Sequence, residues 1–110
     1  MTARPILVVE LPVPAGREDE WNAWYHDVHI PDVLANVPGA RHSTRYRLVA
    51  GDDDVRYLVV HEFDSLTTLQ SYFDSPVLAE RWSDYARLWG SRAAVRRRAF
   101  EPIFDGGDRA

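Results

Sequence analysis

The sequence contains neither cysteine nor lysine. The lack of thiols excludes disulfides, thiolate metal sites and cysteine nucleophiles. Because all 13 basic residues are arginine, the chain has no lysine for a Schiff base and no phosphate loop of the Gly-Lys-Ser/Thr type. Several familiar enzyme classes are therefore excluded.

Long hydrophobic runs are also missing. The N-terminal run from Ile6 ends at Pro12, which makes it too short for the core of a signal peptide. No run approaches the ~20 apolar residues that are needed to span a bilayer. We therefore expect a cytoplasmic protein that has no membrane partner.

The chain has 110 residues, of which 45% are hydrophobic, and a formal net charge of -4. This length suits one hydrophobic core, so we expect a single domain over 1–110, with 1–4 and 105–110 as loose termini. The cluster Arg96-Arg97-Arg98 could be a nucleic-acid patch, but the acidic balance favours a strand rim or a mixed-charge surface. No nucleic-acid partner is expected.

Apolar spacing and turn residues divide the chain into strands and helices. Short apolar or alternating runs predict strands over 5–13, 40–49, 55–63 and 94–104. Apolar spacing of three and four residues predicts a helix over 17–37 and a second helical region made of 65–73 and 76–89. The order β-α-β-β-α-β predicts an α+β, ferredoxin-like fold in which two helices cover one face of an antiparallel sheet. We expect a second copy of the chain to cover the other face.

The stretch 17–37 carries most of the polar chemistry. Its acidic start, Glu18-Asp19-Glu20, lies where carboxylates meet the positive end of a helix dipole. Five side chains are expected on one face of this helix: Trp21, Trp24, Tyr25, Val28 and Asp32. Pro31 cannot continue a regular hydrogen-bond ladder, so the helix is expected to kink or restart near Ile30.

Turn and capping residues mark the other elements. The turn 51–54 is rich in Gly and Asp and is expected to join two strands into a hairpin. Ser65 and Ser75 are expected helix caps, and Pro76 suits the first position of the second helix. That helix carries an apolar stripe of four residues: Leu78, Trp82, Tyr85 and Trp89.

These residues form a recognisable pattern along the chain. It consists of Trp24-Tyr25-x-x-x-His29-x-Pro31, Pro38-Gly39, Arg45-Tyr46, and Arg56-Tyr57-Leu58 followed by Glu62-Phe63. The pattern resembles the dimeric α/β-barrel superfamily, and within it the branch related to the ethyl tert-butyl ether degradation protein (EthD-like). The similarity runs from Ile6 to Phe104.

The resemblance implies a homodimer whose two sheets pack face to face, with one small-molecule pocket in each subunit between sheet and helices. Members of the superfamily include cofactor-free monooxygenases, lactone isomerases, polyketide cyclases, dehydratases, haem enzymes and proteins of no known activity. The resemblance therefore indicates the architecture more closely than the chemistry.

His29 is the first candidate for catalysis. Measured around an ideal helix from Trp21 at ~100° per residue, His29 lies ~80° away, on the flank of the aromatic face. His26 lies ~140° away and is expected to point to solvent. Histidine titrates near neutral pH, so His29 could act as general base or acid. The alternative is a structural histidine that is hydrogen-bonded to a strand carbonyl.

His61 and Glu62 are neighbours on a strand and must face opposite sides of the sheet. His61 shares a mostly apolar side with Tyr57 and Phe63, which favours burial. A register error of one residue would exchange the two sides. Both residues therefore stay candidates, His61 for catalysis and Glu62 for substrate binding.

Tyr25 and Arg45 are further catalytic candidates, because they could hold the negative charge that develops on a carbonyl oxygen. Packing or a structural ion pair is the alternative for each. Six aromatic residues are expected to bind substrate, since they could line a pocket for a flat ligand: Trp24, Tyr46, Tyr57, Trp82, Tyr85 and Trp89.

Metal and cofactor signals are weak. His26 and His29 with Asp32 or His61 could hold a metal, but their spacing is looser than that of an H-E-x-x-H motif, so no metal is expected. No G-x-G-x-x-G opens a helix, which argues against a nucleotide cofactor. A haem would need one axial histidine in a large apolar pocket. We expect no cofactor, with haem as the alternative.

The sequence thus predicts a cofactor-independent enzyme that uses histidine acid–base chemistry on a carbonyl-containing aromatic or polyketide-like compound. Isomerase, cyclase and lyase reactions share that first proton transfer. One alternative is a cofactor-free monooxygenase of the antibiotic-biosynthesis type. Another is a non-catalytic ligand-binding or accessory protein.

Overall fold

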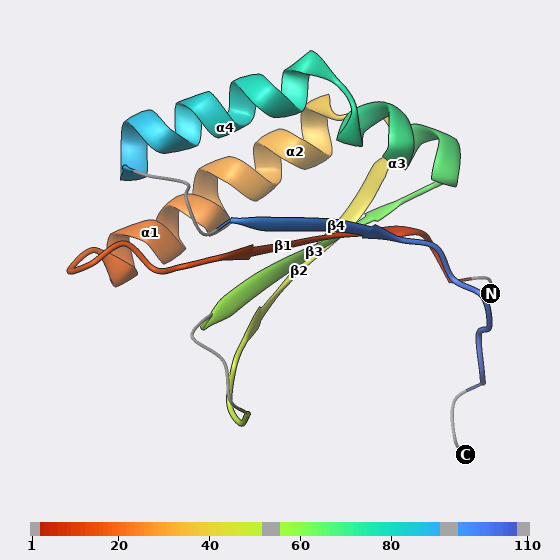
Figure 1. The fold of residues 1–110 in the computed structure, drawn as a ribbon, viewed down its shortest axis with the longest axis horizontal. Coiled ribbons are helices and arrows are strands. Elements are labelled where there is room, and N and C mark those ends of the chain that lie inside the picture. The colour runs from red at the N-terminus through yellow and green to blue at the C-terminus, as the bar shows by residue number, and fades with distance from the viewer. Residues whose placement is uncertain (1–2, 52–55, 91–94, 108–110) are drawn as a thin grey trace.

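The computed structural model describes residues 3–51, 56–90 and 95–107. The elements in chain order are β1 (Ile6–Leu11), α1 (Glu18–Trp24), η1 (Tyr25–His29), α2 (Ile30–Asn36), β2 (Ala40–Arg47), β3 (Tyr57–Phe63), α3 (Leu66–Phe73), α4 (Pro76–Trp89) and β4 (Arg96–Phe100). All the helices lie over one face of a twisted sheet, and the other face of the sheet is left uncovered (Figure 1). Within the described ranges, no helix has both the length and the apolar character to cross a membrane.

The sheet has the strand order β2-β3-β1-β4. Every neighbouring pair is antiparallel, and the central β1 places Val9 opposite Val59 of β3 and Arg97 of β4. The predicted α+β, ferredoxin-like fold is therefore confirmed. The central strands read as apolar runs because both of their neighbours satisfy their backbone groups and the helices cover one face.

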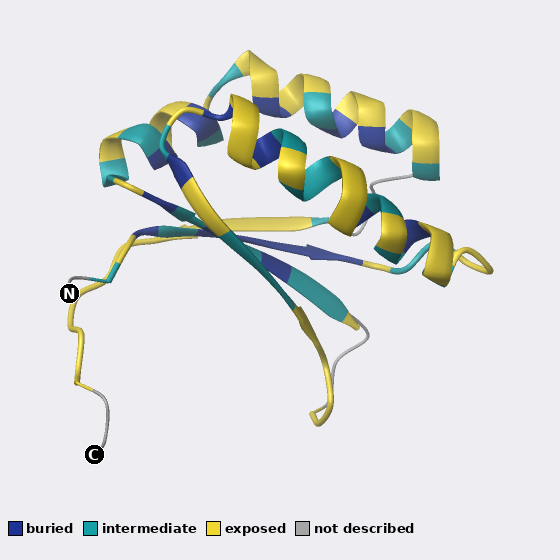
Figure 2. Ribbon diagram, turned by 180° about the vertical axis from the view of Figure 1, so that it is seen from behind, coloured by how far each residue is buried: buried dark blue, intermediate teal, exposed yellow. Residues whose placement is uncertain are grey.

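The core lies between the sheet and the helices (Figure 2). Alternate residues of β1 and β3 point toward the helices, because successive side chains of a strand face opposite sides. The largest fully buried side chains come from five elements and are Trp21, Phe63, Leu7, Leu69 and Val33. This packing is what positions the helical residues described below.

The first helix is interrupted by η1, a single π-helical turn between α1 and α2. Inward-facing residues consequently recur every four positions, at Trp21, Tyr25, His29, Val33 and Val37. The wider π turn accounts for this spacing, since an ideal α-helix repeats every 3.6 residues.

The π turn corrects one expectation and agrees with another. Val28 was expected on the apolar face but is 54% exposed, and Val33 is buried instead. The helix was expected to kink or restart near Ile30, and α2 begins at Ile30, directly after the π turn. Pro31 sits in the first turn of α2, where its missing N–H needs no partner.

The capping predictions for the later helices are confirmed. The hydroxyl of Ser65 accepts from the backbone N–H of Thr68 at 3.1 Å, and that of Ser75 accepts from Leu78 at 3.3 Å. The fourth helix buries Leu78, Trp82 and Tyr85 as its stripe predicts. These caps fix where α3 and α4 begin over the sheet.

The last strand is shorter than expected. It was predicted over 94–104, but β4 ends at Phe100, and Pro102 cannot donate to a ladder. Residue 94 and the expected turn residues 52–54 lie outside the described ranges. The segment 101–107 runs away from the body of the molecule (Figure 1).

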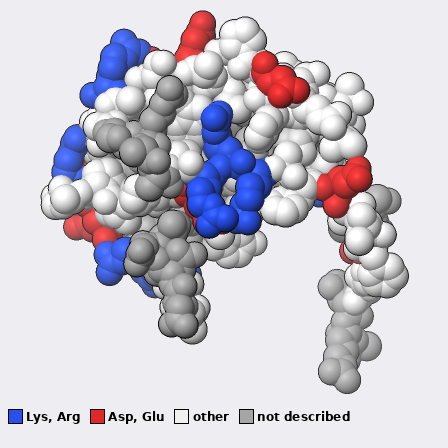
Figure 3. Space-filling view, in the orientation of Figure 1, with Lys and Arg blue, Asp and Glu red and all other residues white. Residues whose placement is uncertain are grey.

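The arginines of the basic cluster on β4 contact other residues of the same chain. Figure 3 shows basic side chains gathered over this edge strand, in agreement with the predicted strand rim. Arg96 and Arg98 both pair with Glu10, a buried carboxylate on the neighbouring β1. Arg97 points the other way and lies 5.3 Å from the Trp82 ring centre.

Gly39 allows a test of the junction between α2 and β2. It has a φ of 85°, and an added Cβ would lie 2.5 Å from the Cβ of Thr68. Gly16 has a similar φ of 72° but open space around it. We expect Gly16→Ala to lower the free energy of unfolding by about 1–2 kcal/mol, the cost of a left-handed backbone. Gly39→Ala should cost at least about 2 kcal/mol more, because Thr68 must also move.

Urea unfolding of the two variants measures this difference. Equal losses in both variants would show that the close approach of Gly39 to Thr68 contributes nothing.

Candidate functional site

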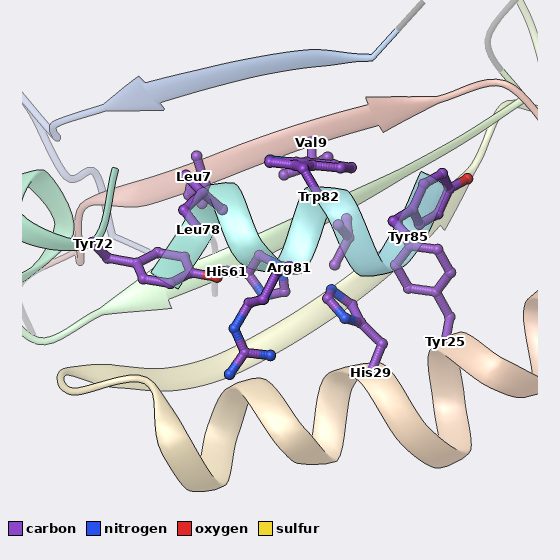
Figure 4. Close-up of a pocket in the computed structure, with 11 residues that line it drawn as sticks. Leu7, Val9, Tyr25, His29, His61, Tyr72, Leu78, Arg81, Trp82 and Tyr85 are labelled. Atoms are coloured by element: carbon purple, nitrogen blue, oxygen red, sulfur yellow. The ribbon is translucent and has the colours of Figure 1, made fainter. Parts of the chain in front are cut away.

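A small cavity lies between the inner face of β1 and β3, the π turn η1, and the helices α3 and α4 (Figure 4). Its volume is about 20 Å³, which is room for about one water molecule. Eleven residues line it: Leu7, Val9, Tyr25, His29, Val59, His61, Tyr72, Leu78, Arg81, Trp82 and Tyr85.

His29 points into this cavity from η1 (Figure 4). Its ring stacks on Trp24 with 4.9 Å between ring centres and meets the edge of Tyr25 at 5.1 Å. Residues five apart lie ~140° apart on an ideal α-helix, so the π turn is what allows Trp24 to stack on His29. Within the described ranges, neither ring nitrogen of His29 has a hydrogen-bond partner, and the ring is held by aromatic packing alone.

His29 is neutral at pH 7. Burial, and after it the positive charge of Arg81, lowers the pKa of His29 from its usual value to about 4. Asp32 acts in the opposite direction, and Arg45 adds a small lowering contribution. The imidazole therefore has a free lone pair at neutral pH and can accept a proton.

His61 faces the cavity from β3, opposite His29. Its Nδ1 lies 2.7 Å from the hydroxyl of Ser43 on β2, a hydrogen bond whose direction depends on the ring tautomer. Burial, with smaller contributions from His29 and Arg81, lowers the pKa of His61 to about 3. The two imidazole ring centres are 6.2 Å apart, so the cavity holds two neutral rings on opposite walls.

Arg81 reaches the cavity from α4 and pairs with Asp32 of α2. The pair joins the two helices, and Figure 4 shows the Arg81 side chain extending from α4 toward the first helix. The Nε of Arg81 is buried and has no hydrogen-bond partner among the described residues. Arg81 is the one charged residue among those that line the cavity.

Three tyrosines add hydroxyl groups to the walls. Burial raises the pKa of Tyr25, Tyr72 and Tyr85 above the usual value, so each stays protonated and able to donate. The Tyr85 hydroxyl accepts a hydrogen bond from Nε1 of Trp21 at 3.0 Å. The Tyr72 hydroxyl points into the cavity (Figure 4).

Five of the predicted site residues meet at the cavity: Tyr25, His29, His61, Trp82 and Tyr85. The structure also decides between the two neighbours on β3, since His61 faces the helices. Glu62 lies on the open face of the sheet, 3.8 Å from Arg4. Glu62 therefore lies away from the cavity, contrary to its expected substrate-binding role.

Arg45, a predicted catalytic residue, also lies outside the cavity. Its guanidinium sits 4.4 Å from the Tyr25 ring centre and within 5.1 Å of those of Trp21 and Tyr57. It donates to Asn22 at 2.6 Å. The Tyr25 ring thus separates Arg45 from the cavity, and the structural alternative describes Arg45 better.

Four of the predicted substrate-binding aromatics have other positions. Trp24 stacks on the His29 ring. Trp89 packs against Arg17, whose guanidinium carbon lies 4.2 Å from the Trp89 ring centre. Tyr57 donates to Glu18 at 3.0 Å, and Tyr46 is 53% exposed. Aromatic character alone could not distinguish the residues that line the cavity from those that pack behind them in the core.

Sequence reasoning missed six lining residues: Leu7, Val9, Val59, Tyr72, Leu78 and Arg81. The apolar four were recognised as core or strand residues, and only the fold shows that they border a cavity. Arg81 had one usable signal, because it lies one residue before Trp82 on a stripe that faces the core. A charge beside a buried stripe suggests a partner on a neighbouring element.

The fold and the cavity define a ferredoxin-like α+β protein with a buried, histidine-lined site between sheet and helices. The chain belongs to the family described as Domain of unknown function (DUF4286), whose model matches residues 5–103. No protein of curated function matches the sequence.

Several solved structures are similar. An EthD family protein from Bacillus halodurans is 16% identical, with a TM-score of 0.66 over 91% of this chain and 99% of that chain. A ferredoxin-like DABB family protein from Mesorhizobium loti is 16% identical, with a TM-score of 0.62 over 94% and 100%. The resemblance to the EthD-like branch is thus confirmed at the level of the fold.

The expectation of no cofactor is contradicted by a third structure. The haem-degrading protein MhuD from Mycobacterium tuberculosis carries two haems in its active site. It is 25% identical, with a TM-score of 0.61 over 94% of this chain and 99% of that chain. A variant of MhuD holds two manganese protoporphyrins per active site. The sequence alone could not indicate a haem ligand. A single axial histidine has no second ligand at a fixed spacing and therefore forms no recognisable motif.

The two buried imidazoles predict acid sensitivity. Between about pH 6.5 and pH 4 the unfolded chain binds protons that the folded chain does not, because both folded-state pKa values are lowered. Stability is therefore complete above pH 6.5 and falls as the pH falls. We expect a loss of about 2 kcal/mol per imidazole between pH 7 and pH 5.

Urea unfolding of the wild type and of His61→Asn at both pH values tests this expectation. The variant should show a smaller pH dependence, whereas His42→Gln, a change at an exposed histidine, should keep the wild-type slope. An unchanged slope in His61→Asn would contradict the buried, neutral state of His61.

Proposed function

We propose that this protein binds a small carbonyl compound in the cavity and that His29 removes a proton from the carbon next to the carbonyl. The observation that carries the proposal is the facing pair of His29, which is partly buried, and His61, which is buried; both are neutral and their ring centres are 6.2 Å apart. An imidazole that is neutral at pH 7 is in the protonation state that a general base requires.

The proton transfer uses groups that the structure brings together. The C–H bond of the substrate breaks, the proton goes to a ring nitrogen of His29, and the electron pair moves onto the carbonyl oxygen as an enolate. The Tyr72 hydroxyl can donate to that oxygen from the opposite side of the cavity. Isomerisation, cyclisation, elimination and oxygenation can all begin with this step, so the later chemistry depends on the substrate.

A haem was tested against the same site. Neutral imidazoles are suitable axial ligands. However, ligand pockets for molecules of drug size enclose roughly 300–1,000 Å³, whereas this cavity measures about 20 Å³. As folded, the lining side chains do not fit a porphyrin, and a small carbonyl compound also needs α2 and α4 to move apart, though by much less. The proposed step is built on the chain's own residues. A Soret band on titration with haemin would show that the helices open further.

A probe for the proposed step is hydrogen–deuterium exchange in D₂O, followed by NMR. Reversal of the step returns a deuteron to the carbon, so exchange reports proton removal whatever reaction follows. Phenylpyruvate and phenylacetone are suitable aromatic carbonyl probes. We expect His29→Gln to slow the catalysed exchange by about 100-fold, the typical contribution of a general base.

His42→Gln provides the control and should exchange at the wild-type rate. Wild-type exchange rates in His29→Gln would remove His29 from its proposed role. Binding of a probe without any exchange would favour the non-catalytic, ligand-binding alternative. Oxygen consumption with the probe alone would identify an oxygenase.

We further propose that the protein is a homodimer through the open sheet face. The hairpin end and the segment 101–107 project below this face at opposite ends (Figures 1 and 2). Ile103 and Phe104 are 94% and 86% exposed. A groove of about 320 Å³ at the hairpin end is lined in part by Tyr46, Leu48 and Val49.

A two-fold rotation that packs the open faces together brings the segment 101–107 of one copy to the hairpin groove of the other. The charges are complementary, since the segment carries Glu101 and Asp105 and the groove carries Arg47 and Arg56. The second copy therefore supplies the chain segment that fills the groove.

Sedimentation of the purified protein tests this assembly. The wild type should sediment as a dimer, and the double change Ile103→Ser with Phe104→Ser should shift it toward monomer. Leu88→Ser, at an apolar residue on α4 that is 49% exposed, should leave the dimer intact. A monomeric wild type, or a double variant that stays fully dimeric, would refute the proposal.

A further inference from the structure

The ion pair between Arg81 and Asp32 joins α4 to α2 beside the cavity that Arg81 lines. Its two sides differ in their surroundings. The Arg81 side chain is 16% exposed, while that of Asp32 is 45% exposed. The cation is thus fixed in the protein, and the anion lies at the surface.

Arg81 has donors that its partner does not use. Asp32 accepts from Nη1, whereas the buried Nε has no acceptor among the described residues. A guanidinium presents its N–H groups as a planar fork that suits two carboxylate oxygens at once. A buried donor without a partner costs stability, so a ligand that satisfies Nε gains what the folded chain lacks.

The cavity carries an unbalanced positive charge toward any ligand. Its two imidazoles are neutral, its tyrosines are protonated, and Arg81 is the one charged residue in the lining. Asp32 can return to water at little cost, because it is nearly half exposed and also has Asn36 as a partner at 2.6 Å. An incoming anion can therefore replace Asp32 on Arg81.

We propose that the ligand of this site is a small-molecule carboxylate, which Arg81 binds in place of Asp32. The inference rests on the proposed function for the position of the ligand. It adds the chemical class of the substrate, a carbonyl compound with a carboxylate, and it assigns Arg81 as a specificity-determining residue. Release of Asp32 frees the Arg81 side chain to move, which enlarges the mouth of the closed cavity.

Replacement of Asp32 by a ligand carboxylate on Arg81 also affects the pKa of His29. His29 is faced by Asp32 from α2, Arg81 from α4, Arg45 from β2 and His61 from β3. The two arginines lower the pKa of His29, and Asp32 raises it. A ligand carboxylate on Arg81 lies inside the cavity, closer to the ring than an exposed carboxylate. Binding is thus expected to raise the pKa of His29 toward neutral and to make it a stronger base.

Phenylpyruvate and phenylacetone test the inference as a matched pair, because a methyl group in phenylacetone replaces the carboxylate. Binding to the full chain is followed by the NMR signals of the His29 and His61 rings. We expect phenylpyruvate to bind at least about 10-fold more tightly than phenylacetone, since a charged pair in a partly buried site contributes this much or more. Equal affinities would overturn the inference.

Variants of the ion pair give the second readout. Asp32→Asn should tighten phenylpyruvate binding several-fold by removing the competing anion, and Arg81→Gln should weaken it at least about 30-fold. Arg81→Lys keeps the charge but loses the fork and should lie between the two. Changes at exposed ion pairs, Glu20→Gln and Arg41→Gln, should leave binding unchanged.

The outcomes separate the two proposals. Phenylpyruvate binding that Arg81→Gln does not weaken refutes the carboxylate site, even if His29-dependent exchange is observed. Arg81-dependent binding without exchange supports the carboxylate site and refutes the proton transfer. Thermal unfolding of each variant confirms that it is folded. If phenylpyruvate at millimolar concentration does not bind to the wild type, the inference is wrong.

Discussion

The stacking of His29 on Trp24 across the π turn is the contact on which the site depends. A regular α-helix would turn these residues ~140° apart and direct the imidazole away from the sheet. The extra backbone width of η1 brings the rings to 4.9 Å and leaves the nitrogens of His29 free to face His61. Such π turns recur at functional sites because they redirect one side chain without ending the helix.

Burial and nearby positive charge both lower the pKa values of the two imidazoles. Both rings lose hydration, and Arg81 adds positive charge nearby, so both are neutral over the physiological range. This neutral state costs stability in acid, because there the unfolded chain binds protons that the folded chain does not. Groups with strongly shifted pKa values that face one cavity are typical of functional sites.

The sequence was sufficient for the fold, because strand alternation, caps at Ser65 and Ser75 and the stripe on α4 all agree with one topology. It also drew attention to His29, which lies in a motif and lines the cavity. It could not place Arg45, since a cation among three aromatic rings has no sequence signature, and it could not reveal the π turn, because a 3.6-residue repeat was assumed. Arg81 and Asp32 are 49 residues apart, so their pairing depends on how α4 crosses α2.

The two outer strands of the sheet have a consequence for how copies of this protein can meet. The strand order places β2 and β4 at the edges, and both are rich in arginine, with Arg41, Arg45 and Arg47 on one and 96–98 on the other. Rows of like charge discourage the addition of a further strand from another molecule. Growth of the sheet into a continuous ribbon is thereby disfavoured at both sides.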